Sequence, residues 1–171
     1  MCSGPPGRRG CVQRIDSLLE LIDAYDGEID LFRAMIANRF TGHRGYRVIQ
    51  QISGVGPTFA AVFVAEIGDV RRFSRPEKLC CWAGLTPRHR ESDTTVHRGP
   101  ITKQGSKLVR WAAIEACQRT RPGSKLAADR TRIITARGRN IGVVAAARRL
   151  LTLVYYGLRD GEIRTLAARA G

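Results

Sequence analysis

The sequence has no apolar run long enough to cross a membrane. Its longest apolar stretches, residues 59–65 and 141–147, are far shorter than the roughly 18 residues that span a bilayer. The first ten residues contain no apolar core, so we expect no secretory signal. These features favour a protein that works in the reducing cytoplasm and has no membrane partner.

Cysteines and clustered acids are also scarce. The five cysteines include no C-x-x-C pair, so neither a disulfide framework nor a zinc site is predicted. Outside residues 13–42, which we expect to form the first helix, no D-x-D or comparable acidic cluster lies on a strand. Because a two-metal nuclease needs several converging carboxylates, we expect no metal site and no cofactor in this chain.

Positive charge is in excess. The 171 residues include 29 Lys and Arg against 15 Asp and Glu, a formal net charge of +14. This excess favours a polyanionic partner, with nucleic acid ahead of a membrane surface. With 43% hydrophobic residues, the composition is globular, and the length fits one compact domain with an appendage.

The strongest periodic signal lies near the N-terminus. Apolar residues recur in steps of three and four over residues 15–36, as in a coiled-coil helix that associates with a second copy. The alternative is an amphipathic helix packed on the chain's own core. We expect a disordered lead-in over 1–12, the helix over 13–42 and a helical domain over 43–171. The repeat consists of Ile15, Leu18, Ile22, Tyr25, Ile29, Phe32 and Ile36.

The pattern beyond residue 43 also indicates helices. Ser74 and Glu77 have capping-box spacing at the start of one of them. No alternating β pattern is evident, so the predicted fold class is all-α with one long irregular loop. The expected helices cover residues 46–52, 58–67, 75–83, 106–120, 124–136 and 141–158.

Residues 46–67 have the layout of a helix-hairpin-helix. The turn between the two helices reads Ser53-Gly54-Val55-Gly56-Pro57, in which glycine permits positive φ and proline suits a first helical turn. Backbone N–H groups at such a turn can bind a phosphate without reading base sequence. A glycine turn kept only for steric reasons is the alternative. The predicted DNA contacts here are Gly54, Val55, Gly56 and Thr58.

Residues 85–105 are polar, basic and long, which is typical of a functional loop and also of a solvated one. Within this segment, Ser92 could attack a phosphodiester if a base removed its proton and nearby cations stabilised the phosphoryl charge. His89 and His97 are candidate bases by sequence proximity alone. Composition by itself favours a plain polar residue at Ser92, because several threonines nearby also carry hydroxyls. The predicted DNA-binding residues of this segment and the following helix are Arg88, Arg90, Arg98, Lys103, Lys107 and Arg110.

Several sequence blocks occur in a distinctive order. They are residues 52–57 (ISGVGP), 65–73 (AEIGDVRRF), 82–87 (WAGLTP), Ser92 and 101–110 (ITKQGSKLVR). Together they resemble the C-terminal transposase domain of the insertion-sequence one-hundred-ten group. The resemblance implies a recombinase that mobilises an insertion sequence, with DNA and a structured guide RNA as partners.

The resemblance also implies a serine nucleophile that forms a covalent link to DNA, and the matching position is Ser92. In such proteins an N-terminal RuvC-like domain supplies four acidic metal ligands, and nothing before Ile15 can hold that domain. We therefore expect a truncated or separately encoded portion that is inactive alone, with Mg²⁺ needed only in the missing domain. Two residues depart from the usual pattern: Asp93 replaces glycine and would repel phosphate, and Ser106 replaces asparagine.

A second hypothesis assigns no chemistry to the chain. In this hypothesis the helix-hairpin-helix and the positive charge serve a non-catalytic DNA-binding protein, whose affinity for DNA falls steeply with salt concentration. Replacement of Ser92 would leave that binding unchanged. A purely structural coiled-coil protein does not explain the basic excess.

Overall fold

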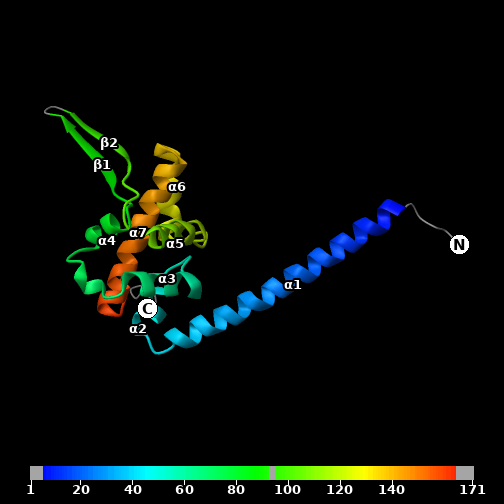
Figure 1. Ribbon diagram of the computed structural model, residues 1–171. Coiled ribbons are helices and arrows are strands. Elements are labelled where there is room, and N and C mark those ends of the chain that lie inside the picture. Colours follow the sequence, from blue (N-terminus) through cyan, green and yellow to red (C-terminus); the bar gives the residue numbers. More distant parts are fainter. Residues whose placement is uncertain (1–5, 93–94, 165–171) are drawn as a thin grey trace. The chain divides into compact units, whose positions relative to one another are not determined.

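The computed structural model describes residues 6–92 and 95–164 (Figure 1). Side chains are described for residues 10–88 and 99–164. The chain divides into two compact units, Met1–Arg39 and Phe40–Gly171. Helices dominate the described part and the strands form a single two-stranded sheet, which confirms the all-α prediction.

The first unit consists of nearly all of helix α1 (Pro6–Phe40). This helix starts earlier than expected, so the prediction of a disordered lead-in over residues 1–12 is wrong for residues 6–12, and residues 1–5 lie outside the described part. Proline suits the first turn of a helix, and extending an existing helix costs little compared with nucleating one. The apolar side chains of the repeat are open to solvent, with exposed fractions from 44% at Ile29 to 61% at Tyr25, except for the half-buried Ile36 at its end.

The second unit contains every helix predicted beyond residue 43. Their ends differ from the expected ones by at most three residues, which is the usual uncertainty of a helix boundary. The elements are α2 (Arg44–Ile49), α3 (Pro57–Ile67), the 3₁₀ helix η1 (Val70–Arg72), α4 (Pro76–Trp82), β1 (Pro87–Ser92), β2 (Thr95–Ile101), α5 (Lys107–Gln118), α6 (Lys125–Arg137) and α7 (Arg139–Asp160).

Helix α7 is the central element of this unit. It contacts α2, η1, α4, α5 and α6, and its side chains Leu150, Leu151 and Val154 are fully buried. By length and composition alone, α7 is also apolar enough to cross a membrane, the one described helix that is. Its burial among the other helices accounts for the same apolar composition, because a core helix must be hydrophobic on most of its surface.

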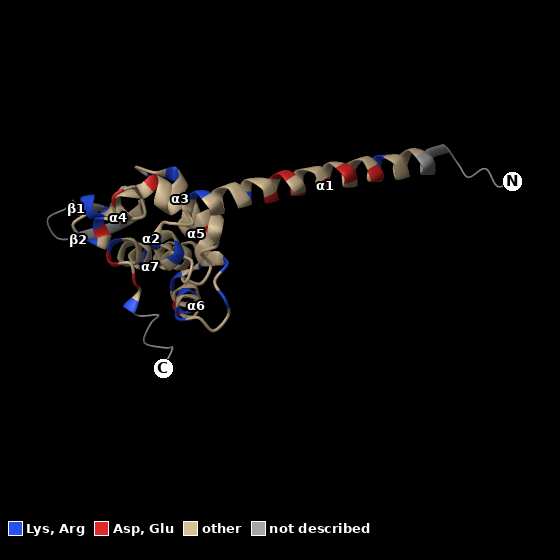
Figure 2. Cartoon of the chain, turned by 90° about the horizontal axis from the view of Figure 1, so that it is seen from below, with Lys and Arg blue, Asp and Glu red and all other residues tan. Residues whose placement is uncertain are grey.

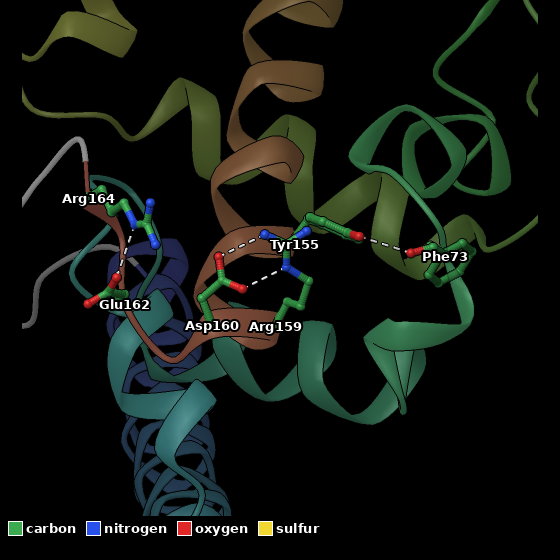
Figure 3. Close-up of polar contacts among 6 residues, drawn as sticks. All are labelled: Phe73, Tyr155, Arg159, Asp160, Glu162 and Arg164. Carbon is green, nitrogen blue, oxygen red and sulfur yellow. Dashed lines mark hydrogen bonds and ion pairs between the residues drawn. The ribbon is translucent and has the colours of Figure 1, made fainter.

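One polar contact ties the end of α7 to the rest of the unit, and another lies within α7 (Figure 3). The buried Tyr155 hydroxyl donates to the carbonyl oxygen of Phe73 at 2.9 Å, which satisfies a polar atom that burial would otherwise leave unpaired. Arg159 donates to both carboxylate oxygens of Asp160, at 2.6 and 2.9 Å. These hydrogen bonds hold the pKa of Asp160 below its ordinary value.

Residues 85–105 are not the irregular loop that was predicted. They contain an antiparallel ribbon in which Arg90 is paired with His97 and Ser92 with Thr95, with an irregularity between Pro87 and His89. Alternation of apolar and polar residues marks a strand only where one face of the strand is buried. The ribbon is rich in Arg, His and Thr and pairs through its main chain, so the sequence carries no such pattern.

Serines cap two of the helices but not α4. Ser106 and Ser124 accept hydrogen bonds from the backbone N–H groups of Val109 and Ala127, both at 3.2 Å. The prediction of a capping box at Ser74 is wrong, because Arg75 occupies the N-cap of α4 and no side chain caps this helix. Pro76 lacks an N–H and starts the helix without needing a partner there.

Candidate nucleic-acid interface

The two units differ sharply in charge. Residues 1–39 contain five Arg and six Asp or Glu, whereas residues 40–171 contain 24 Lys and Arg against nine Asp and Glu. Figure 2 shows the acidic residues as bands along α1 and the basic residues spread over the helical unit. The attraction for a polyanion that the sequence predicts therefore belongs to the second unit.

The base of the ribbon is held tightly between α4 and α5. Gly84 and Gly105 both have positive φ, at 70° and 81°. A Cβ at Gly105 would overlap the carbonyl oxygen of Trp82. The backbones of these two residues therefore approach so closely that only glycine fits at position 105. The Lys103 N–H also donates to the Gly84 carbonyl oxygen at 3.1 Å. Both ends of the ribbon are thus fixed in one place.

Arg110 contributes to this joint. Its side chain is half-buried and Nη1 donates to the carbonyl oxygen of Ala83 at 3.0 Å. An orphan carbonyl at the end of α4 thereby gains a charged partner. Arg110, which the sequence predicted as a DNA contact, is engaged within the fold.

The other predicted cations are placed differently. Arg88, Lys103 and Lys107 are exposed, and Lys103 is the one non-glycine residue with positive φ in the described part, at 55°. Residues held in sparsely populated backbone regions often mark functional segments. Arg90 and Arg98 lie in the part of the ribbon whose side chains are not described.

Ser92 is the last residue of β1 and lies next to the ribbon's turn. Its register partner is Thr95, and Asp93 falls outside the described residues, as does the side chain of Ser92. Residues two apart on a strand, and register partners on neighbouring strands, belong to the same face of a ribbon. By that rule Arg90 and His97 belong to the face of Ser92, and His89 belongs to the other.

The glycine turn between α2 and α3 is present in the predicted order, but two of its four predicted DNA contacts are used inside the fold. Gly54 has φ 91°, and a Cβ there would overlap the carbonyl oxygen of Ala116 on α5. The Val55 N–H donates to the Ile52 carbonyl oxygen at 2.9 Å. Gly56 and Thr58 are exposed at the start of α3. Phosphate binding at these residues stays a prediction.

A polar link that sequence reasoning missed joins the end of α3 to the start of α5. Ser106 Oγ donates to Glu66 Oε2 at 2.8 Å while it caps α5. The position of Ser106 before a helix predicts the cap. Nothing in the sequence brings Glu66 to it, because the two residues lie 40 positions apart.

The cysteines divide into buried and exposed thiols. Burial raises the pKa of both Cys80 and Cys117 to about 11, so these thiols are protonated and inert near neutral pH. Cys11 and Cys81 are exposed. Among the side chains that the structure describes, those of residues 10–88 and 99–164, no three of His, Cys, Asp or Glu are grouped closely enough to hold a metal ion.

The chain is similar to proteins of insertion elements. It is 31% identical over 162 residues to the insertion element IS900 uncharacterized 42 kDa protein of Mycobacterium paratuberculosis, covering 92% of this chain and 40% of that protein. It is 28% identical over 162 residues to the insertion element IS110 uncharacterized 43.6 kDa protein of Streptomyces coelicolor, covering 92% and 39%. The chain spans about two fifths of the length of these relatives.

A transposase is also among the relatives. The transposase for insertion sequence element IS1111A of Coxiella burnetii is 28% identical over 112 residues, 63% of this chain and 31% of that protein. These matches make the proteins of insertion elements, a transposase among them, the class of protein that the chain is similar to. More particularly, residues 46–130 match the model of the Transposase IS116/IS110/IS902 family, to which the chain is related.

Proposed function

We propose that this chain is the DNA-binding and strand-cleaving part of an insertion-sequence recombinase, with Ser92 as its nucleophile. The observation that carries the proposal is the position of Ser92 at the end of β1, beside the turn of a ribbon whose base is fixed by Gly84, Gly105 and Arg110. A nucleophile must be presented in a defined geometry. The basic unit around the ribbon supplies the attraction for DNA.

The proposed step is a transesterification at phosphorus. The Ser92 oxygen forms a bond to the phosphorus, the bond from phosphorus to one bridging oxygen breaks, and that oxygen takes up a proton to leave a strand end with a free hydroxyl. The serine proton passes to a base, because an unactivated hydroxyl is a poor nucleophile. The product is a serine–DNA phosphodiester that a second strand end can attack, which restores the serine.

The ribbon register favours His97 over His89 as that base. His97 is paired with Arg90, which is two residues before Ser92 on β1, so both belong to the face of the nucleophile. His89 belongs to the opposite face. In this arrangement Arg90 is the cation closest to Ser92 along the same face of β1. We propose that it stabilises the charge on the phosphoryl oxygens.

Further partners of the proposed recombinase come from the family resemblance. An acidic RuvC-like domain that binds Mg²⁺ and a guide RNA would act together with these residues in strand cleavage. The described residues offer no cluster of metal ligands, and the proposed attack by Ser92 uses only residues of this chain. Homo-oligomerisation through residues 15–36 of α1 also belongs to the proposal, because their exposed apolar side chains fit a second copy.

A non-catalytic DNA-binding protein is the second candidate function. Asp93, directly after Ser92, favours it because a carboxylate beside the nucleophile repels an approaching phosphate. Such a protein would use the basic unit for DNA binding and leave Ser92 without a role.

Covalent adduct formation separates the two candidates. The chain, supplied with the acidic domain, Mg²⁺ and the guide RNA, should yield a protein–DNA adduct that survives denaturing electrophoresis. Ser92→Ala should abolish the adduct, and its register partner provides the matched control Thr95→Ala, which should retain it. His97→Ala should slow adduct formation by roughly 100-fold or more, the usual contribution of a general base, and His89→Ala should slow it much less.

Two outcomes would contradict the catalytic proposal. An adduct that persists in Ser92→Ala would assign the link to another residue. Salt-steep binding of DNA without any adduct from the unaltered chain would favour the non-catalytic candidate, with a slope of roughly 0.9 log units of affinity per log unit of salt for each phosphate neutralised on duplex DNA.

A further inference from the structure

One aromatic side chain on α5 stands out because the core does not cover it. Trp111 is 48% exposed and its neighbour Leu108 is 52% exposed, although large apolar side chains elsewhere in this unit are mostly buried. Trp82, the other tryptophan, is half-buried and stacks on Arg72, whose Cζ is 4.7 Å from its ring centroid. Trp111 has no such cation over it in the described contacts.

Phe59 contacts the indole of Trp111 and restricts its orientation. The indole ring meets the buried Phe59 ring of α3 edge to face, with centroids 5.5 Å apart and planes at 73°. Arg119, at the end of α5, lies over the same Phe59 ring with Cζ at 5.5 Å from the centroid. Edge-to-face contacts restrict the orientation of an aromatic ring, so Trp111 is oriented by Phe59 while about half of its surface stays open to solvent.

Cations flank this plane along α5. Lys107 lies one turn before Trp111 and is exposed, and Arg119 lies over Phe59, the ring that Trp111 also contacts. Glu115, one turn after Trp111 and half-buried, is the acid on this side of the helix, and Glu66 is already bonded to Ser106. We call Lys107, Leu108, Trp111 and Arg119, together with Phe59 beneath them, the Trp111 surface.

We infer that the Trp111 surface binds an unpaired nucleobase of a single-stranded nucleic acid, which stacks on the indole while Lys107 and Arg119 attract the adjoining phosphates. Aromatic planes between cations are the usual means of binding single strands, and they tolerate any base because every base has a π face. Protein-docking surfaces are poor in lysine but also rich in Trp and Arg, so a protein partner is an outcome that the test must distinguish. This inference rests on the proposed DNA-binding function and adds a class of ligand, since the base faces of a duplex are covered by stacking on the neighbouring base pairs.

Binding of a short oligothymidylate and of a duplex of equal length to the 171-residue chain tests the inference. Trp111→Ala should weaken single-strand binding by roughly fivefold or more, the lower end of the effect expected for one stacked base, and should change duplex binding less than twofold. Trp111→Phe, which keeps an aromatic plane, should stay within twofold of the unaltered chain. Tyr156→Ala is the matched control, because Tyr156 is an exposed aromatic beside Arg159 on α7.

The salt dependence separates stacking from charge. Trp111→Ala should lower single-strand affinity equally at all salt concentrations, whereas Arg119→Ala should reduce the slope of log affinity against log salt by roughly 0.7 if it neutralises one phosphate. Trp111→Leu is the control for misfolding, since it keeps an apolar side chain over Phe59 but removes the aromatic plane. It should behave as Trp111→Ala does.

Two results would overturn the inference: single-strand affinity unchanged in Trp111→Ala, or equal losses of affinity for single strand and duplex. Unchanged affinity together with altered sedimentation of the protein would assign the surface to a second copy of the chain. Duplex binding by the unaltered chain leaves the proposed function standing in either case. Failure of the unaltered chain to bind either nucleic acid would reject both.

Discussion

Gly54 and Ala116 touch where the turn between α2 and α3 rests on the last full turn of α5. A Cβ at Gly54 would overlap the carbonyl oxygen of Ala116, and the backbone of Gly54 has a φ of 91°. This glycine therefore serves tertiary packing. A Cβ at Gly56, two residues later, would meet nothing within 4 Å, and Gly56 precedes the first residue of a helix. The two glycines of one turn have different roles.

Gly54→Ala should destabilise the protein by roughly 2–4 kcal/mol, because it combines a strained backbone conformation with a steric overlap. Gly56→Ala should change stability by about 0.5 kcal/mol or less, since its φ of −84° is open to alanine. Urea denaturation followed by circular dichroism measures both. Equal effects of the two substitutions would show that the packing of Gly54 on α5 is not the deciding contact.

Arg110→Ala should loosen the base of the ribbon. Loss of the hydrogen bond to the Ala83 carbonyl oxygen should cost about 1–3 kcal/mol, the range for a bond to a charged group. The amides of Thr102 and Lys103, which donate to Thr86 and Gly84, should then exchange hydrogen faster. Lys107→Ala is the matched control, as Lys107 is exposed and starts the same helix; similar exchange in both variants would argue against a role for Arg110.

Thiol labelling should distinguish the buried cysteines from the exposed ones. With the pKa of Cys80 and Cys117 at about 11, their thiolate fraction at pH 8 is roughly 100-fold below that of an ordinary thiol, and burial slows access further. Cys11 and Cys81 should therefore react first, as peptide mass mapping can show. Fast labelling of Cys117 would indicate local opening between α5 and α7.

These raised pKa values also set the sign of a pH effect on stability. An unfolded cysteine has a pKa near 9.0 and the folded ones about 11, so on alkaline titration the unfolded state releases its protons first. Stability should be constant below pH 9 from this source and fall between pH 9 and 11. The fall should be smaller in the Cys80→Ala, Cys117→Ala double variant, measured by thermal denaturation; an identical fall would assign it to other groups.

Ile22→Asp should weaken self-association through α1 by roughly tenfold or more, because it places a charge in an apolar seam. Ala24→Asp adds the same charge outside the repeat and should have little effect. Sedimentation velocity at micromolar concentration measures both. A monomeric unaltered chain would reject association through residues 15–36, as would equal losses in the two variants.

The helices of the second unit could be predicted because local signals agree with the packing. Pro57 and Pro76 start helices, Ser106 and Ser124 cap them, and Gly84 follows the end of α4 with positive φ. Each of these signals acts within one helical turn. Such residues can be interpreted without knowing what the helix packs against.

The ribbon and the joint at its base could not be predicted. Backbone hydrogen bonds between β1 and β2 leave no hydrophobic pattern in the side chains, and Arg110 meets Ala83 only because α4 and α5 come together. The same holds for Ser106 with Glu66. Arg110 and Gly54, predicted as DNA contacts, are used by the fold itself because contacts between distant segments decide which polar groups remain free.

The sequence by itself determined the helical class, the apolar repeat of α1 and the concentration of positive charge beyond residue 40, since periodicity and composition depend only on residue types and their spacing. Tertiary structure alone decided that the basic segment is a ribbon with Ser92 beside its turn, that Arg110 supports it, and that Trp111 stays exposed over Phe59. These features depend on which surfaces of separate helices meet, and that choice is made by packing of the whole core.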